Sequence, residues 1–376
     1  MVDVVVTGIG LISALGNNLE SSWQKLISGQ TGINLHQPFP ELKPRPLALI
    51  GQQPAELTEI TRQVVSMVLK DADLVSPLAD CGVVMGSSRS FQGKWEELSK
   101  SGKTDFFPKI LPFSHLNAIN TAHQIGSTGI VLAPMAACAT SIWAIFQGFN
   151  LIKNGECNRV IAGAQEAPIT PLTIAGFQQM GALATTGSYP FDIDREGLVL
   201  GEGAAAFILE SEELAKQRNA KVYGRILGFG LTADAYHANA PDPQGKMASL
   251  TIKQCLQRAG LIFEDIDYIH AHGTGTQLND IIESKIIQKL FPYNVAVSST
   301  KGATGHTLGA SGALGIAFCL MAFEKQILPP SVGLKKPEFD LNFVTEACNP
   351  NTTIRRSLCL SFGFGGQNAA IALAQA

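Results

Sequence analysis

A cysteine stands out in this chain as a residue whose type and setting could perform nucleophilic catalysis. Cys138 follows Ala136 and Ala137 at the end of an apolar segment and opens a long, uncharged helical pattern, which Lys153 and Gly155 close with the cation and stop signal of a helix C-terminus. The spacing predicts Cys138 in the first helical turn, where the helix dipole favours the thiolate. By composition alone, a lone cysteine among alanines is more often a small buried apolar residue.

Two histidines far along the chain strengthen the catalytic interpretation. His272 lies within the segment 269–276 and His306 ends the segment 298–306, each after a short strand-like run and before small residues. An isolated histidine at a loop edge is more often structural. A cysteine more than a hundred residues away from two such histidines nevertheless suits a site that the fold assembles.

The segments that must position these side chains alternate between β-type and helical patterns. Strand-like runs cover 2–6, 81–85, 159–161, 204–209, 295–298 and 357–361. Helical patterns cover 20–27, 57–70, 247–259, 280–291 and 308–325. The alternation predicts an α/β fold with largely buried strands. A buried helical pattern follows His306 as another follows Cys138, and this faint internal echo favours a duplicated architecture.

Length and composition limit the class of protein. A chain of 376 residues with 45% hydrophobic residues can bury a large core, and 16% charged residues indicates extensive burial, including surface lost to a partner subunit. A net charge of -3 gives no broad basic field, so we expect no nucleic acid ligand.

Cysteine spacing and hydropathy bear on metals and on location. The seven cysteines lack C-x-x-C spacing, which argues against a zinc site and a disulfide framework, so we expect no metal. The first residues lack a signal-peptide pattern, which predicts a cytoplasmic protein. The uncharged stretch 302–323 approaches membrane-spanning length, but its glycines and internal histidine favour a buried core helix over a membrane span.

Six motifs in order along the chain resemble those of the β-ketoacyl-acyl carrier protein synthases of the elongating type, condensing enzymes with a Cys-His-His site. They cover 4–10, 136–141, 191–204, 269–276, 298–306 and 361–368, so the resemblance extends over essentially the whole chain. It implies the thiolase-like fold, with two similar β/α halves in a five-layered αβαβα structure. The expected halves are 1–220, carrying the cysteine, and 221–376, carrying both histidines.

The resemblance implies a decarboxylating condensation in fatty acid, specialised lipid or polyketide synthesis. Cys138 would attack an acyl thioester carried by acyl carrier protein, with backbone N–H groups of Cys138 and Phe364 stabilising the oxyanion. His272 and His306 would then hydrogen-bond the thioester carbonyl of malonyl-acyl carrier protein during decarboxylation. Lys301 and Glu283 match the family's supporting pair, although Glu283 read without the resemblance fits a solvated helix face.

Further residues match positions that handle substrate in the family. Thr274 and Thr276 match hydroxyls that hold the phosphopantetheine arm. Phe364 would gate the acyl pocket, with Phe362 and Phe177 beside it. The only cofactor implied is the phosphopantetheine of the carrier, and relatives imply a homodimer.

Some residues depart from the family's pattern. Where relatives place a basic cluster that docks the carrier, the segment 56–62 offers two acids and only Arg62, which Lys103 and Lys109 could join in a reduced patch. The segment 178–183 lacks an expected arginine, and Ser141 stands where many relatives have glycine. The choice of carrier therefore stays open.

Other classes of protein fit the residues less well. A thiolase would need a second catalytic cysteine, and an initiating synthase would need Cys-His-Asn. A non-elongating partner subunit, which sets chain length in polyketide systems, typically lacks the cysteine, but an intact cysteine does not prove turnover. For a dinucleotide-binding protein, Gly8 and Gly10 follow a strand, but Ser13 breaks the G-x-G-x-x-G pattern.

Overall fold

The computed structural model describes residues 2–101, 113–350 and 353–376, which form an α/β fold. The strands are β1 (Val4–Ser13), β2 (Asn34–His36), β3 (Arg45–Leu47), β4 (Gly82–Gly86), β5 (Val131–Leu132), β6 (Arg159–Glu166), β7 (Gly203–Ser211), β8 (Gly224–Ala233), β9 (Tyr268–His270), β10 (Ala296–Ser298), β11 (Arg356–Gly363) and β12 (Gln367–Ala374). The helices are α1 (Leu19–Ile27), α2 (Leu57–Asp71), α3 (Gln92–Ser101), α4 (Leu116–Ile125), α5 (Thr140–Lys153), α6 (Pro171–Gln179), α7 (Glu212–Gln217), α8 (Lys246–Ala259), α9 (Gln277–Leu290), α10 (Lys301–Thr304) and α11 (Ser311–Lys325).

The main sheet repeats one strand pattern twice. Its order is β10-β9-β11-β12-β8-β1-β7-β6-β4-β5. From each outer edge inward, three parallel strands are followed by two antiparallel ones, so β5-β4-β6-β7-β1 mirrors β10-β9-β11-β12-β8. The two halves join where β1 pairs with β8 over three residues. This repetition explains why similar buried helical patterns follow Cys138 and His306 in the sequence.

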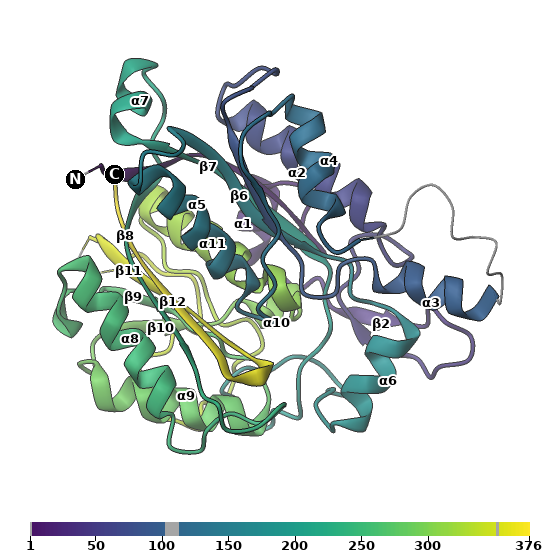
Figure 1. Cartoon of the computed structure of the whole chain (residues 1–376). Coiled ribbons are helices and arrows are strands. Elements are labelled where there is room, and N and C mark those ends of the chain that lie inside the picture. Colours follow the sequence, from purple (N-terminus) through teal and green to yellow (C-terminus); the bar gives the residue numbers. More distant parts are fainter. Residues whose placement is uncertain (1, 102–112, 351–352) are drawn as a thin grey trace.

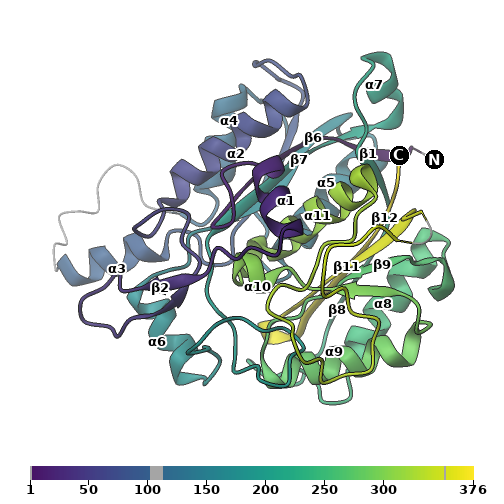
Figure 2. The ribbon, with the colours of Figure 1, turned by 180° about the vertical axis from the view of Figure 1, so that it is seen from behind.

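Helices form the central and outer layers of a thiolase-like αβαβα structure. Figure 1 shows α5 and α11 together in the middle of the molecule, where α5 contacts β4 and β6 and α11 contacts β11 and β7. Helices α2 and α4 cover the outer face of the first half, and α8 and α9 cover that of the second, as Figure 2 shows from behind. Because α5 and α11 lie between the two halves of the main sheet, they are apolar on most faces.

The longest apolar stretch lies inside this central layer. Among the described residues, one helical stretch, Leu308–Lys325, is long and apolar enough to cross a membrane, and 89% of it is buried inside the structure. Every residue from Ser311 to Phe323 is buried. The burial agrees with the prediction of a core helix.

Candidate active site

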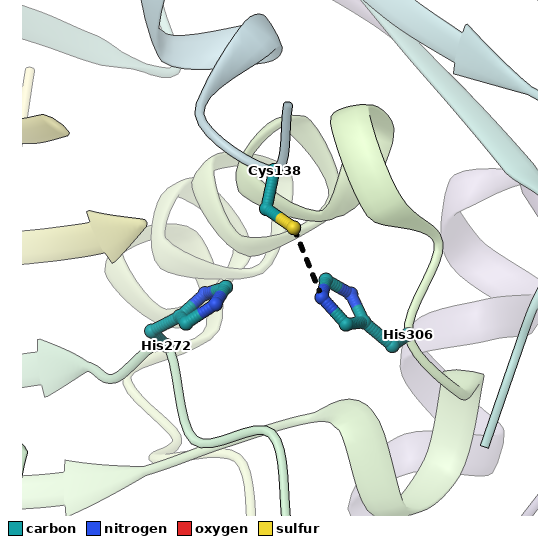
Figure 3. Close-up of side chains that lie close together, drawn as sticks. All are labelled: Cys138, His272 and His306. Carbon is teal, nitrogen blue, oxygen red and sulfur yellow. Dashed lines mark hydrogen bonds between the residues drawn. The ribbon is translucent and has the colours of Figure 1, made fainter. Parts of the chain in front are cut away.

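A tight turn, and not the helix itself, holds Cys138. Helix α5 begins at Thr140 with Ala139 as its N-cap, so the prediction that Cys138 lies in the first turn is wrong. Ala137 has a φ of 47°, a left-handed conformation that alanine rarely adopts. The Thr140 hydroxyl fixes the turn by accepting from the Ala136 N–H at 2.9 Å and donating to the Ala137 carbonyl at 2.7 Å. The turn aims the Cys138 side chain away from the α5 axis, toward both histidines (Figure 3).

His306 is the nearer histidine to the sulfur. Its Nε2 lies 3.3 Å from Cys138 Sγ, and its Nδ1 lies 2.8 Å from the hydroxyl of Ser311 at the start of α11. Its backbone N–H donates to the Val199 carbonyl at 2.7 Å, and its carbonyl accepts from the Gly201 N–H at 3.0 Å. Both ring nitrogens and the backbone are therefore held.

His272 completes a compact triangle with these two residues. Its ring centroid is 5.4 Å from that of His306, with the rings at 80°, and one ligand atom from each of Cys138, His272 and His306 lies within 4.8 Å of the others (Figure 3). Three such atoms have the composition of a metal site. The buried ammonium of Lys301 beside them opposes a further cation. The absence of a metal stays a prediction.

Two carboxylates on α9 hold the loop that carries His272. Glu283 accepts from the backbone N–H groups of His272 at 2.6 Å and Gly273 at 2.7 Å. Asp280 likewise accepts from the Thr274 N–H at 3.0 Å. Lys301 Nζ donates to the His272 carbonyl. Glu283 is therefore not on a solvated helix face, because it and Asp280 are buried and bind the active-site loop.

Burial sets the protonation states of the site. It raises the pKa of the Cys138 thiol to about 11, against the opposing effects of Lys301 and the Phe364 backbone N–H. Burial and the charge of Lys301 also hold the pKa values of His272 and His306 well below the usual range. The resting site at neutral pH is therefore a thiol beside two neutral imidazoles. The expected stabilisation of a thiolate by the helix dipole is overcome by desolvation.

The raised pKa predicts a steep pH dependence of alkylation. Because the thiolate is the nucleophile, iodoacetamide modification of Cys138 should accelerate about tenfold per unit between pH 7 and 9. Peptide mass spectrometry of the 138-containing fragment against time measures the rate. A plateau below pH 8 would show instead that the resting cysteine is already ionised.

The backbone around Phe364 approaches the cysteine closely. The Phe364 N–H is directed at the Cys138 sulfur. A Cβ at Gly363 would lie 2.9 Å from the Cys138 nitrogen, so only glycine permits this approach. The Ser361 hydroxyl donates to the Cys138 carbonyl at 2.7 Å. The Phe364 backbone therefore lies within reach of the nucleophile.

A cavity of about 300 Å³ connects the site to the surface. The catalytic triangle lines this cavity. So do all the predicted substrate-handling residues, which are Thr274, Thr276, Phe362, Phe364 and Phe177. The two threonine hydroxyls lie 2.9 Å apart, and the Phe177 and Phe364 rings are stacked at 5.7 Å. A larger cavity of about 860 Å³ lies along residues 264–354 and includes none of the predicted site residues. The smaller cavity is therefore the candidate route for substrate.

Of the three predicted docking cations, one lies in the described part of the chain, so the docking patch stays a prediction. Arg62 is exposed and pairs with Glu59 at 2.7 Å on α2. Lys103 and Lys109 lie outside the described residues. Ser141 is fully buried on α5, with no hydrogen-bond partner for its hydroxyl in the described structure.

Sequence reasoning missed Ser311 and Arg89. Ser311 follows His306 by five residues within an apolar helical pattern, where its hydroxyl was the only available signal. Arg89 places its guanidinium 5.4 Å from the centroid of the Phe177 ring. It follows a strand-like run at 81–85, and a cation at the carboxyl end of a buried strand was the signal.

A cysteine beside two neutral histidines, held in the centre of a duplicated five-layered fold, defines a thiolase-like condensing enzyme. Two family models match this chain: "Beta-ketoacyl synthase, N-terminal domain" over 55–215 and "Beta-ketoacyl synthase, C-terminal domain" over 223–335. The chain belongs to the β-ketoacyl synthase family and is an acyltransferase of that type.

Relatives of known name agree over almost the full length. The chain is 34% identical to the putative mitochondrial 3-oxoacyl-[acyl-carrier-protein] synthase of Schizosaccharomyces pombe, covering 98% of each chain. It is 35% identical to 3-oxoacyl-[acyl-carrier-protein] synthase 2 of Synechocystis, covering 98% of this chain and 97% of the relative. Among solved structures, a type II polyketide ketosynthase in complex with its acyl carrier protein and bound to the hexaketide has 26% identity and a TM-score of 0.91, with full coverage of both chains. The ishigamide ketosynthase/chain length factor is similar at 26% identity and a TM-score of 0.90, covering 100% of this chain and 99% of that one.

Proposed function

We propose that this enzyme joins an acyl group, held on Cys138, to malonyl-acyl carrier protein with loss of carbon dioxide. The observation that carries the proposal is the 3.3 Å contact between Cys138 Sγ and His306 Nε2, with His272 beside them. The elongating function is favoured over that of a non-elongating partner subunit, because the nucleophile is present in this contact and the named relatives are synthases.

In the first half-reaction, His306 Nε2 accepts the thiol proton as Cys138 attacks the acyl thioester. The N–H groups of Cys138 and Phe364 stabilise the oxyanion of the tetrahedral intermediate. The bond to the carrier sulfur then breaks, and the departing thiolate takes the proton back from His306. The acyl group remains as a thioester on Cys138.

In the second half-reaction, His272 and His306 donate hydrogen bonds to the thioester carbonyl of the malonyl group. The bond to its carboxylate breaks, carbon dioxide leaves, and the electron pair moves into an enolate held by the two donors. The enolate carbon attacks the acyl carbon, the Cys138 thiolate departs, and it takes one proton from solvent. Neutral histidines suit this step because each retains one ring N–H that can donate to the carbonyl.

Ser311 is suited to support His306 in both half-reactions. When Nε2 accepts the thiol proton, Nδ1 carries a hydrogen and the Ser311 oxygen accepts it. When Nε2 must donate to the malonyl carbonyl, Nδ1 is unprotonated and the Ser311 hydroxyl donates. A hydroxyl can do both, and the Thr307 hydroxyl at 3.2 Å is a further partner.

Replacing Ser311 by alanine should therefore lower kcat about tenfold with little change in KM, since one hydrogen bond of ordinary strength is lost from the histidine that acts. Steady-state condensation with a fixed acyl thioester measures the loss. Ser141→Ala is the matched control, because its buried hydroxyl has no partner in the described structure. Equal rates for both variants would remove Ser311 from the mechanism.

The carrier and the assembly state are further parts of the proposal. The complex of a similar ketosynthase with its acyl carrier protein supports a carrier-borne substrate. The cavity supports it too, because the Thr274 and Thr276 hydroxyls that line it are able to hydrogen-bond the amides of a phosphopantetheine arm. No other cofactor is proposed. A homodimer is supported by the exposed apolar residues Ile130, Val131 and Met135 at and beside the edge strand β5. Seven free cysteines, six of them buried, suit the reducing cytoplasm.

Intact-protein mass spectrometry tests the proposed function. The purified enzyme is incubated with a panel of acyl-carrier thioesters and then with malonyl carrier. We expect an acyl adduct that is absent in Cys138→Ala and is discharged as β-ketoacyl product. An adduct that malonyl carrier does not discharge would contradict the elongating function.

A further inference from the structure

An arginine that the proposed mechanism does not use lies next to the active site. Arg89 is half-buried in the loop between β4 and α3, with its guanidinium 5.4 Å from the centroid of the Phe177 ring. Phe177 in turn stacks on Phe364, whose backbone N–H reaches the Cys138 sulfur. The charge of Arg89 also opposes the rise of the Cys138 pKa, after the larger effects of Lys301 and the Phe364 N–H. The guanidinium therefore belongs to the surroundings of the nucleophile.

This guanidinium has few partners of its own. It donates to Gln92 Oε1 at 3.4 Å, and it has no ion pair within the described ranges. The nearby Glu166 carboxylate accepts from the Ser87 hydroxyl and from the backbone N–H groups of Ser88 and Arg89, the last at 3.3 Å. In the described structure it forms no ion pair with the Arg89 guanidinium. A guanidinium offers five donors, so most of them remain available.

The position of Arg89 relative to the substrate cavity decides which molecule it can meet. The cavity that opens to the surface is lined by Thr274 and Thr276 and by one side of the Phe177–Phe364 pair, and Arg89 does not line it. During condensation that cavity must hold the malonyl thioester and its arm. The acyl group on Cys138 must then extend elsewhere, and a chain that displaced or passed the Phe364 and Phe177 rings would meet Arg89, which lies against Phe177.

We propose that Arg89 determines acyl specificity, selecting acyl groups that carry an oxygen acceptor, a carbonyl or a carboxylate, in the part of the chain distant from the thioester. This inference rests on the proposed function, because it needs an acyl group on Cys138. A saturated chain would displace water from the guanidinium without replacing the hydrogen bonds to that water, which costs free energy. An oxygen acceptor replaces that water with a charge-assisted hydrogen bond.

The test compares acylation of Cys138 by three pantetheine thioesters of equal carbon number: hexanoyl, 5-oxohexanoyl and adipoyl. Pantetheine thioesters remove any dependence on carrier docking, and intact-mass time courses give the rate for each. We expect the wild-type enzyme to accept at least one oxygenated chain about tenfold faster than hexanoyl, the effect of one hydrogen bond to a charged group. The two oxygenated probes separate a carbonyl from a carboxylate as the favoured group.

Arg89→Met keeps most of the side-chain volume without the charge and should bring the rate ratio close to one, while Arg89→Lys should retain part of the preference. Arg355→Met, at an exposed arginine just before β11, should keep the wild-type ratio. A wild-type preference for hexanoyl, or an unchanged ratio in Arg89→Met, would overturn the inference. If Arg89→Met accelerated acylation by all three thioesters equally, the inference would also be overturned. Arg89 would then act only by blocking the acyl path sterically. No adduct from any thioester would instead refute the proposed function.

Discussion

Cys138→Gln is expected to abolish condensation while keeping the decarboxylation of malonyl carrier. Glutamine cannot form a thioester, so no acyl group can be held. The glutamine side-chain carbonyl can accept hydrogen bonds from the backbone N–H groups of residues 138 and 364. In this respect the variant resembles the acylated enzyme. The donors to the malonyl carbonyl, His272 and His306, are unchanged. Release of carbon dioxide from labelled malonyl carrier measures the first activity, and mass spectrometry of carrier products measures the second.

A second substitution in the Cys138→Gln background separates the roles of the residues. Adding His272→Ala removes one donor to the developing enolate, which should slow carbon dioxide release by about 10²–10³. The matched control is Cys138→Gln with Ser141→Ala, which should decarboxylate at the rate of Cys138→Gln alone. Loss of decarboxylation in a folded Cys138→Gln single variant would show that the cysteine is needed for both half-reactions.

Residue type and local pattern predicted the catalytic triangle, but not its electrostatics. The identities and settings of Cys138, His272 and His306 were visible in the sequence, and the structure brings them within reach of one another. The resting thiol, with its pKa raised to about 11, was not predicted. A helix dipole is a local property that sequence reveals, whereas desolvation depends on how many distant elements close over the sulfur.

The turn before α5 was missed for a related reason. The apolar period extends through Cys138, so the pattern alone places it in the helix. The left-handed Ala137 depends on the Thr140 hydroxyl and on the close approach of Gly363, which is more than two hundred residues away in sequence. Alanine has no intrinsic preference for that conformation, so the two contacts together select it.

The strands were predicted best where their composition is rich in branched apolar residues. The β4, β6 and β7 runs were found, although β6 extends five residues further than expected, to Glu166. The strands β8 and β12 were not found, since glycine and alanine give them little strand propensity. They form because each pairs along most of its length with the other, at the centre of the repeated sheet.

Glu283→Ala should lower the free energy of unfolding by about 3–5 kcal/mol, the usual effect of removing one partner from a buried charged network. The carboxylate accepts from two backbone N–H groups, of His272 and Gly273, and from the Asn279 amide at 3.1 Å. Without it those donors and the buried Lys301 ammonium lose their acceptor and counter-charge, and the loop that carries His272 is released. Urea unfolding followed by tryptophan fluorescence measures the change.

Glu283→Gln distinguishes hydrogen bonding from charge in this network. The single carbonyl oxygen of glutamine can accept from one of the two backbone N–H groups. The free energy of unfolding should therefore fall less than in Glu283→Ala. Burial raises the pKa of Glu283 to about 7, above the unfolded value of about 4.3. Ionising it therefore opposes folding, and its contribution to stability should fall as pH rises from about 4.3 to 7. Glutamine should remove that decline.

The control is Glu213→Ala on the exposed face of α7, which should change stability by less than about 0.5 kcal/mol. If Glu283→Ala were as stable as this control, Glu283 could not be the group that holds the His272 loop. A stable Glu283→Ala enzyme with normal decarboxylation would further mean that Lys301 alone positions His272 through its bond to the carbonyl. The expected result, a loss of both stability and enolate formation, follows because the same carboxylate holds the backbone of the catalytic histidine and balances the buried lysine.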